Sequence, residues 1–519
     1  MLQEAMKPPH QAARRDPAAP GSENEHLRCQ VEQLRKELIE QAEQLAQERQ
    51  RRADAEQHIL EAEKKIADAG KQISDLERQL ALYRQNSTTS SKPPSSDGLA
   101  GAPRERCRRK KSKRKVGGQP GHHGAHRPLV PEDRVAEFHS VWPSQCKQCG
   151  HGLPQPSKES AANNPVRRHQ VTELPPIQAR IIEYQCHCVT CPQCGESTRA
   201  DIPEQARGQF GPQLTALIAY LTVVCRMPRR VVEALLKQAL NIEISLGSTQ
   251  KCWEEASEAV APVCKELEQQ LKSERVLNAD ETGWRMNGSK RFLWVFVAAQ
   301  YIVYTVEATR GSQVLIRMLG SVFEGILCSD RFSAYLKYHR GRAQFCWAHL
   351  KRNVLGVMEL TKNSEVEQFC RDTLAEHAKL FRLWHKLRDG RIDRSQLIVR
   401  SILIQKRLFA LGERNLDSSH RDVRNLAAAL FEHIERLFAF VEYEGVEPTN
   451  NSAERALRTA VQWRKTSFGN RSEKGELATA RLLTAAETCD LQKLNILAYL
   501  SAAISAHRHR QKPASLLPS

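Results

Sequence analysis

The sequence predicts a multidomain α/β protein with an N-terminal coiled coil, a small cysteine-bearing domain, a helical region and a mixed β-sheet that carries a helical insert. Three observations lead to this fold class: a heptad repeat near the N-terminus, two C-x-x-C-G units, and a block of β-branched and aromatic runs between residues 275 and 350. Because 519 residues are too many for one hydrophobic core, we expect several folded units joined by polar connectors.

A heptad repeat occupies residues 25–85, after a polar segment over residues 1–24 that we expect to be a disordered tail. A second row of heptad positions lies four residues before each position of the main seam. This row is apolar at both ends of the repeat and polar in its middle. The pattern predicts a coiled coil that pairs two or more copies of the chain, and the alternative is one long solvated helix packed on its own chain. The main seam consists of Val31, Leu38, Leu45, Arg52, Ile59, Ile66, Ile73 and Leu80.

Residues 86–128 predict a linker followed by a basic arm. Ser, Thr and Pro residues directly after the repeat cannot continue a helix. Nine of the twelve residues from Arg104 to Lys115 are Lys or Arg, which favours contact with a polyanion over the alternative of a merely solvated segment. The side chains expected to make this contact are Arg108, Arg109, Lys110, Lys111, Lys113, Arg114 and Lys115.

The overall charge also favours a polyanionic partner. The chain has 78 Lys and Arg against 60 Asp and Glu, a formal net charge of +18, which makes nucleic acid the first candidate and an anionic membrane surface the second. No apolar run reaches the roughly 20 residues of a spanning helix, so we expect no membrane partner. The first residues lack the apolar stretch of a secretory signal, and we therefore expect a cytoplasmic protein with reduced thiols.

Two C-x-x-C-G units lie within residues 129–205, where we expect a small zinc-binding domain. Each unit puts two thiolates on one tetrahedral zinc ion, and the pair completes a four-sulfur shell that leaves no open position for catalysis. The zinc would therefore be structural, and buried free cysteines are the alternative. Cys186, His187 and Cys188 are close enough in the sequence to compete as ligands. The expected ligands are Cys146, Cys149, Cys191 and Cys194.

The helical region over residues 206–270 shows two short apolar repeats separated by Met227 and Pro228. A helix-turn-helix and an ordinary helical packing module fit this pattern equally well.

After Arg275 the sequence contains runs of β-branched and aromatic residues. We predict three successive strands, then a helix, then a fourth strand, in the order β-β-β-α-β of a mixed sheet. Beyond Leu350 the sequence is helical to about Val441. The predicted elements are strands at 276–279, 292–297 and 301–306, a helix at 312–319 and a strand at 325–329.

Two aspartates directly follow predicted strands of this sheet. Asp280 follows the first strand and Asp330 the fourth, and adjacent strands would bring these ends together. Oxygen ligands of this kind suit Mg²⁺, or Mn²⁺, and a pair of such ions stabilises the attacking and leaving oxygens of phosphoryl transfer. Taken singly, an aspartate at a strand end is usually a capping or solvated residue, and Glu281 is a rival for Asp280.

A third carboxylate is expected from a helix that opens near residue 450. Glu454 lies on that helix, with Asn451 three residues before it and Arg458 four residues after it. This spacing places all three on one helix face, where Arg458 would contact DNA phosphate. The order of the three acids, on a basic chain with two cysteine pairs, favours a catalytic site over three unrelated surface acids.

Five stretches of the chain resemble the insertion sequence 66 family of transposases, and the likeness extends over roughly residues 86–500. They are residues 91–97, 117–122, 279–284, 346–352 and 450–458.

The resemblance implies a ribonuclease-H-like catalytic domain over residues 271–352 and 446–505, interrupted by a helical insert over residues 353–445 and followed by a tail over 506–519. It implies that Asp280, Asp330 and Glu454 form a DDE triad that cleaves DNA at the ends of an insertion sequence and transfers the strands to target DNA. Small accessory proteins of the same element are implied as partners. The alternative function is a catalytically inactive, zinc-containing DNA-binding or regulatory protein.

The sequence departs from the family pattern at a few positions. Many relatives have glycine after the second aspartate, where this chain has Arg331, and Cys186 and Cys188 are additions near the second cysteine pair. We expect residues 346–349 to form a strand that leads toward the site, and we interpret His349 as a packed histidine rather than a DNA or metal contact. Trp284 is interpreted as a core or rim residue rather than a stacking platform for a base.

Overall fold

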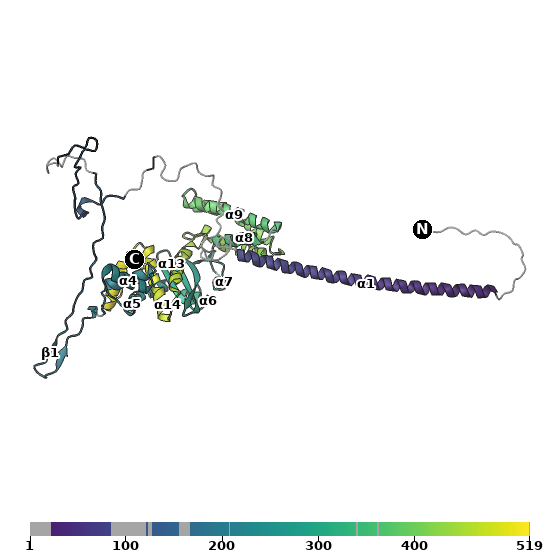
Figure 1. Cartoon of the computed structure of the whole chain (residues 1–519), viewed down its shortest axis with the longest axis horizontal. Helices are drawn as coiled ribbons and strands as arrows, with labels where there is room; N and C mark the ends of the chain where they lie inside the picture. The colour runs from purple at the N-terminus through teal and green to yellow at the C-terminus, as the bar shows by residue number, and fades with distance from the viewer. Residues whose placement is uncertain are drawn as a thin grey trace. The chain divides into compact units, whose positions relative to one another are not determined.

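The computed structural model describes residues 22–84, 121–122, 127–154, 167–206, 208–338, 341–360 and 363–517. Within these ranges the protein is mixed α/β, with a long N-terminal helix and a five-stranded mixed sheet surrounded by helices, as the sequence predicts (Figure 1). The chain divides into two compact units, one of Met1–Gln85 with Met358–Lys362 and one of Asn86–Val357 with Asn363–Ser519. The predicted basic arm and most of the predicted N-terminal tail lie outside the described residues.

The heptad repeat forms one continuous helix, α1 (Ser22–Arg84). Its seam residues are exposed: Val31 is 49% exposed, Ile59 is 59% exposed and Ile66 is 71% exposed. Apolar side chains exposed at this heptad spacing form the surface that a second helix buries in a coiled coil.

The cysteine-bearing region contains little regular structure. It includes the short helix η2 (Glu132–Arg134) and a two-stranded antiparallel hairpin of β1 (Cys188–Thr190) and β2 (Ser197–Arg199), which encloses the second C-x-x-C-G unit. After it come η3 (Glu204–Ala206) and three helices, α3 (Pro212–Val223), α4 (Arg229–Leu240) and α5 (Leu246–Gln270).

The three helices after the cysteines share an apolar core. Ile218 of α3 and Val232 and Leu236 of α4 are fully buried together. Pro228 sits at the N-cap of α4, where its fixed φ and missing N–H suit the start of a helix. Helices α3 and α5 also pack on α14 and α15 at the C-terminal end of the chain, so this region is anchored to the sheet domain.

The central sheet has the strand order β5-β4-β3-β6-β7. Antiparallel pairing joins β3, β4 and β5, whereas β6 and β7 run parallel to β3. The predicted order β-β-β-α-β is therefore confirmed. The bounds are β3 (Val276–Met286), β4 (Ser289–Val297), β5 (Ile302–Glu307), α6 (Ser312–Leu319), β6 (Ile326–Ser329), α7 (Ser333–Tyr338) and β7 (Ala343–Phe345), with η4 (Leu271–Ser273) before the first strand.

Alternation along β4 fills two cores, one on each face of the sheet. Trp294 and Phe296 pack with Leu315 of α6 and Tyr335 of α7. Leu293 and its neighbours on the other face pack against three C-terminal helices, namely α13 (Asn451–Ser467), α14 (Glu473–Leu491) and α15 (Ile496–Arg508). The sheet is thus the middle of three layers, and one helix from the far end of the chain lies against β3.

The residues after α15, expected to be a tail, pack on the domain. Leu516 is buried in the core that contains Trp294, and its carbonyl accepts a hydrogen bond of 2.7 Å from Gln492 Nε2.

The insert is helical, as predicted. Its helices are α8 (Trp347–Leu360), α9 (Ser364–Arg388), α10 (Arg394–Glu413), α11 (Arg421–Glu432) and α12 (Ile434–Glu442). The expected strand at residues 346–349 is not formed: β7 ends at Phe345, and His349 lies in the first turn of α8. In the first turn of α8, the Leu350 N–H donates to the carbonyl of Cys346 at 3.2 Å. None of the described helices is both long enough and apolar enough to span a membrane.

Candidate active site

Asp280 and Asp330 lie at matching distances beyond the paired part of two neighbouring parallel strands. The last residues paired between β3 and β6 are Asn278 and Cys328, and each aspartate stands two residues further along the chain, Asp280 inside β3 and Asp330 directly after the end of β6. Asp280 was expected after the end of a strand, but it lies inside β3, which continues to Met286 because β4 folds back and pairs with it up to Ser289. Because β3 and β6 are neighbours in the sheet, the two aspartates lie near one another, as predicted.

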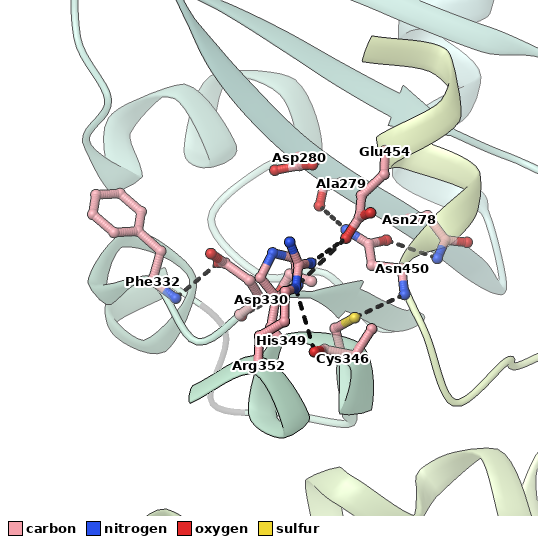
Figure 2. A network of polar contacts seen from close by, with 12 residues as sticks. Asn278, Ala279, Asp280, Asp330, Phe332, Cys346, His349, Arg352, Asn450 and Glu454 are labelled. Atoms are coloured by element: carbon pink, nitrogen blue, oxygen red, sulfur yellow. Dashed lines mark hydrogen bonds and ion pairs between the residues drawn. The ribbon is translucent and has the colours of Figure 1, made fainter. Parts of the chain in front are cut away.

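Burial and like charges act together on the two aspartates. Burial raises the pKa of Asp280 well above its usual value, and the carboxylates of Glu281, Asp330 and Glu454 raise it further. Burial also raises the pKa of Asp330, against the opposing effects of the Phe332 amide and three nearby arginines. The Phe332 N–H donates to Asp330 Oδ1 at 2.9 Å (Figure 2). The site therefore concentrates negative charge in a desolvated place.

Glu454 comes to this site from the first turn of α13. Its Oε1 accepts a hydrogen bond of 3.0 Å from Arg352 Nη2 and lies 3.5 Å from His349 Nδ1 (Figure 2). Both partners belong to α8, three residues apart, so that one face of that helix meets the glutamate. Burial lowers the pKa of His349 to about 4, with Arg352 and Arg331 acting in the same direction. His349 is therefore neutral at physiological pH and not an ionic partner of the glutamate.

Asn450 fixes the start of α13 against the sheet. Its side chain is 1% exposed, donates from Nδ2 to the Ala279 carbonyl at 2.8 Å and accepts from Asn278 Nδ2 at 2.9 Å. Its backbone N–H donates to Cys346 Sγ at 3.2 Å. Asn451, which the helical spacing pointed to, is exposed instead. Asn450 does not stand out in the sequence, because its partners are backbone and side-chain atoms of a strand some 170 residues away.

Glu281, the rival of Asp280, points to other partners. Its Oε1 lies 2.6 Å from Arg310 Nη2, and its Oε2 accepts from the hydroxyl of Tyr335. Arg310 is itself stacked 3.8 Å above the ring of Phe332. Adjacent residues of a strand face opposite sides of the sheet, so Glu281 is committed to an ion pair with Arg310 while Asp280 faces Glu454.

A cavity of about 460 Å³ opens beside Asp330. Arginine and histidine side chains line much of it, together with Asn353 and the ring of Phe332. Burial lowers the pKa of Arg331, but the group stays a cation beside the Asp330 carboxylate, which raises that pKa. In the sequence, Arg331 stands out only as a departure from the family pattern. In the structure it lines this cavity with Arg310, His349 and His433.

The carboxylates surround one region without closing on a single point. Among the described residues, one set of three or more Cys, His, Asp or Glu side chains has its donor atoms all within 4.8 Å of one another, and it consists of Cys346, His349 and Glu454. Asp280, Asp330 and Glu454 do not meet that limit as a set.

Two further residues were singled out in the sequence. Arg458, the expected phosphate contact on α13, is exposed. Trp284 is a core residue, as interpreted, and donates from Nε1 to Asn470 Oδ1 at 2.6 Å.

The two C-x-x-C-G units form the same tight loop. In each, the glycine N–H donates to the carbonyl of the first cysteine at 2.9 Å, and the first cysteine N–H donates back at 2.8 Å to a residue after the glycine. Gly150 and Gly195 have φ of 72° and 73°, a conformation that glycine adopts without strain. Backbone N–H groups of Cys149 and Gln148 lower the pKa of the Cys146 thiol, and those of Cys194 and Gln193 do the same for Cys191.

The two C-x-x-C-G loops support the predicted zinc site, but their four sulfurs do not form a cluster in the described residues. No three of Cys146, Cys149, Cys191 and Cys194 lie within 4.8 Å of one another in the described part of the chain. Cys186 is half-buried and Cys188 is exposed at the start of β1.

Comparison with known proteins adds the family to this geometry. Residues 207–478, which include the whole sheet and all three acids, match the model of the transposase IS66 family. The chain belongs to the IS66 family of transposases. This family is of the DDE, ribonuclease-H-like type, and the resemblance found in the sequence is confirmed. Residues 6–128 of this member of the IS66 family match a second model, a family of unknown function (DUF6444).

Proteins similar to this member of the IS66 family include uncharacterized proteins of Sinorhizobium fredii (strain NBRC 101917 / NGR234). Protein y4qI is 28% identical over 46% of this chain and 49% of its own length. Protein y4hP is 22% identical over 69% of this chain and 70% of its own length, and y4jD is 24% identical over 40% and 42%. The chain thus spans about half the length of y4qI. None of the three relatives has a name that describes an activity.

Proposed function

We propose that this IS66 transposase cleaves DNA at the ends of its insertion sequence and transfers the freed strands to target DNA, with Asp280, Asp330 and Glu454 as the catalytic acids. The observation that supports this most strongly is that Asp280 on β3 and Asp330 directly after β6 each stand two residues beyond the last paired residues of these strands, with Glu454 close enough to raise the pKa of Asp280. Two of these acids, Asp280 and Asp330, are desolvated close to one another, an arrangement that folding alone would not favour.

The donor set fits hard divalent cations. Asp280 and Asp330 each accept one backbone N–H, from Glu281 and Phe332, so that most of their oxygen lone pairs are free. Their mutual repulsion, which raises the pKa of Asp280, would be relieved by a bound cation. Asp280, Asp330 and Glu454 would hold Mg²⁺ or Mn²⁺ here. When bound, such ions activate the attacking oxygen and stabilise the leaving oxygen of phosphoryl transfer.

The neighbouring cations have a separate part in the proposal. Arg310 and Arg331 line the cavity beside Asp330, where a DNA phosphate would meet charge-assisted donors. Arg352 holds Glu454 before cations bind, at 3.0 Å. Asn450 keeps the first turn of α13, and with it Glu454, against β3 through its two side-chain hydrogen bonds.

The rest of the chain is assigned to DNA binding and assembly. We propose a coiled coil over residues 25–85, which joins two or more copies through the exposed seam of α1, and a basic arm within residues 86–128 that binds DNA phosphates. Residues 129–205 would be a zinc-binding domain, with Zn²⁺ on the four knuckle cysteines, and residues 206–270 a helical region, either helix-turn-helix or packing module. The catalytic domain would comprise residues 271–352 and 446–505, with the insert between them, and accessory proteins of the same element would assist it.

Strand cleavage of labelled DNA that carries the element's ends tests the proposal. Wild type with Mg²⁺ should cut and join the DNA, whereas Asp330→Asn should still bind it and lose cleavage by at least about 100-fold. Asp372→Asn, an exposed acid on α9, is the matched control and should cut normally. Equal cleavage by wild type and Asp330→Asn would refute the triad, and inactive wild type would favour the alternative of a regulatory protein.

A further inference from the structure

The closest cluster of metal-ligating side chains in the described part of the chain is not the acidic triad. Donor atoms of Cys346, His349 and Glu454 lie within 4.8 Å of one another, although the residues come from the start of α8 and from α13 (Figure 2). One sulfur, one imidazole nitrogen and one carboxylate oxygen therefore converge, and Glu454 belongs to both groups.

We propose that Cys346, His349 and Glu454 form a second metal site, specific for a borderline-soft divalent cation such as Zn²⁺, which competes with the hard cations of the triad for Glu454. A thiolate and an imidazole favour zinc-type ions over magnesium, which binds oxygen ligands. Three protein ligands leave a fourth position to water or to a DNA oxygen. The competition for Glu454 rests on the proposed catalytic function, whereas the site itself does not.

The histidine is prepared to accept a cation at Nδ1. This atom is shielded from solvent and has no hydrogen-bond partner, and Glu454 Oε1 lies 3.5 Å away, beyond good hydrogen-bond geometry. Buried polar atoms are nearly always hydrogen-bonded, so that an unpartnered ring nitrogen facing a carboxylate and a thiol calls for a ligand. The imidazole ring also lines the cavity beside Asp330, which gives a cation a path from solvent.

The sulfur is placed as a ligand as well. Cys346 is 3% exposed, and its Sγ accepts the backbone N–H of Asn450 at 3.2 Å, the kind of amide-to-sulfur bond that stabilises a metal-bound thiolate. Cation binding would release the thiol proton to solvent. Cys328 on β6 is equally buried but belongs to no such group, which makes it a natural comparison.

Arg352 limits the affinity of this site without closing it. Its guanidinium pairs with Glu454 Oε1 at 3.0 Å, while Oε2 of the same carboxylate has no hydrogen-bond partner among the residues described. Because Oε1 is also the oxygen that lies 3.5 Å from His349 Nδ1, a cation at this site would share the Glu454 carboxylate with Arg352. The nearby positive charge disfavours weakly bound cations, and the thiolate has to supply the selectivity for zinc-type ions.

Cobalt titration of the full chain tests the site, because thiolate-bound Co²⁺ has a charge-transfer band that oxygen-bound Co²⁺ lacks. The signal from the knuckle cysteines is common to all variants and cancels in difference spectra. Wild type should show one more thiolate-bound equivalent than Cys346→Ala, and His349→Ala should bind that equivalent at least about tenfold more weakly. Cys328→Ala should match wild type. Identical titrations of wild type, Cys346→Ala and His349→Ala would overturn the site.

A cleavage assay then tests the competition. Micromolar Zn²⁺ should inhibit Mg²⁺-dependent cleavage by wild type, and Cys346→Ala should lose this sensitivity relative to its own rate without zinc. Zinc inhibition that is unchanged in Cys346→Ala would overturn the competition. Asp330→Asn separates the two proposals, since it should abolish cleavage and leave the cobalt difference band intact. Full cleavage by Asp330→Asn would refute the triad while leaving the cobalt result to decide the second site.

Discussion

At the scale of single residues, the buried side chain of Asn450 joins the third acid to the sheet. It makes hydrogen bonds with Ala279 and Asn278, on the strand that carries Asp280. Because both ends of the Asn450 amide have hydrogen-bond partners, the side chain is held in one orientation. Asn450 therefore acts by positioning the start of α13.

Replacing Asn450 by alanine should lower the free energy of unfolding by about 1–3 kcal/mol, because the Ala279 carbonyl and the Asn278 amide would lose their partner in a buried place. Asn451→Ala, one residue along and exposed, should change it by less than about 0.5 kcal/mol. Urea unfolding monitored by circular dichroism measures both. Equal losses in the two variants would show that Asn450 acts only through local helix propensity.

The raised pKa of Asp280 predicts a dependence of stability on pH. Folded Asp280 keeps its proton at a pH where the unfolded chain, with an aspartate pKa of about 3.9, has lost it. The folded state therefore binds more protons, and metal-free protein should lose stability as pH rises above about 4. Asp280→Asn should flatten this decline and be the more stable protein at pH 7 without divalent cations. Unfolding curves at several pH values measure it, and an unchanged slope in the variant would contradict the buried, charge-crowded site.

The residues that could be predicted from the sequence are those whose chemistry is visible in isolation. Asp280, Asp330 and Glu454 stand out by their order after strands and before a helix, and by the family motifs. Asn450 and Arg352 acquire their roles through contacts between segments about 100 to 170 positions apart. No local pattern encodes such contacts, although the motif over residues 346–352 marks the helix that supplies one of them.

At the scale of elements, α1 and β3 show where local patterns succeed and fail. The heptads predict α1 almost to its ends, because a helix needs no distant partner for its hydrogen bonds. The start of β3 was predicted correctly, but its length was not, since seven residues past Ala279 are strand because β4 pairs with them. Strand ends are set by their neighbours rather than by their own composition.

The exposed seam of α1 predicts that the helix pairs with a second copy. Ile59→Asp should shift the full chain toward monomer, because a charge would enter the apolar interface of the coiled coil. Leu60 is more exposed still, at 71%, but lies off the seam, so that Leu60→Asp should leave the oligomer intact. Light scattering coupled to size exclusion measures the masses. Monomeric wild type, or equal effects of the two variants, would contradict the pairing.

At the scale of the whole molecule, the charges of the predicted arm should set the salt dependence of DNA binding. Replacing Lys110 and Lys111 by alanine should weaken binding to any duplex and reduce the slope of log K against log salt by about 2, if both contact phosphates. Lys64 and Lys65 on α1 form a matched pair of neighbouring lysines, and their replacement should leave the slope unchanged. Fluorescence anisotropy at several salt concentrations measures the slopes, and equal slopes in the two double variants would remove the arm from the interface.

Three acids, Asp280 on β3, Asp330 directly after β6 and Glu454 on α13, are proposed to hold divalent cations together. Mn²⁺ binding by the full chain, followed by electron paramagnetic resonance, tests this proposal most directly. Asp280→Asn, Asp330→Asn and Glu454→Gln should each weaken Mn²⁺ binding by at least about tenfold, while Asp490→Asn, an exposed acid at the end of α14, should bind as wild type does. Unaltered Mn²⁺ binding in all three site variants would contradict the account.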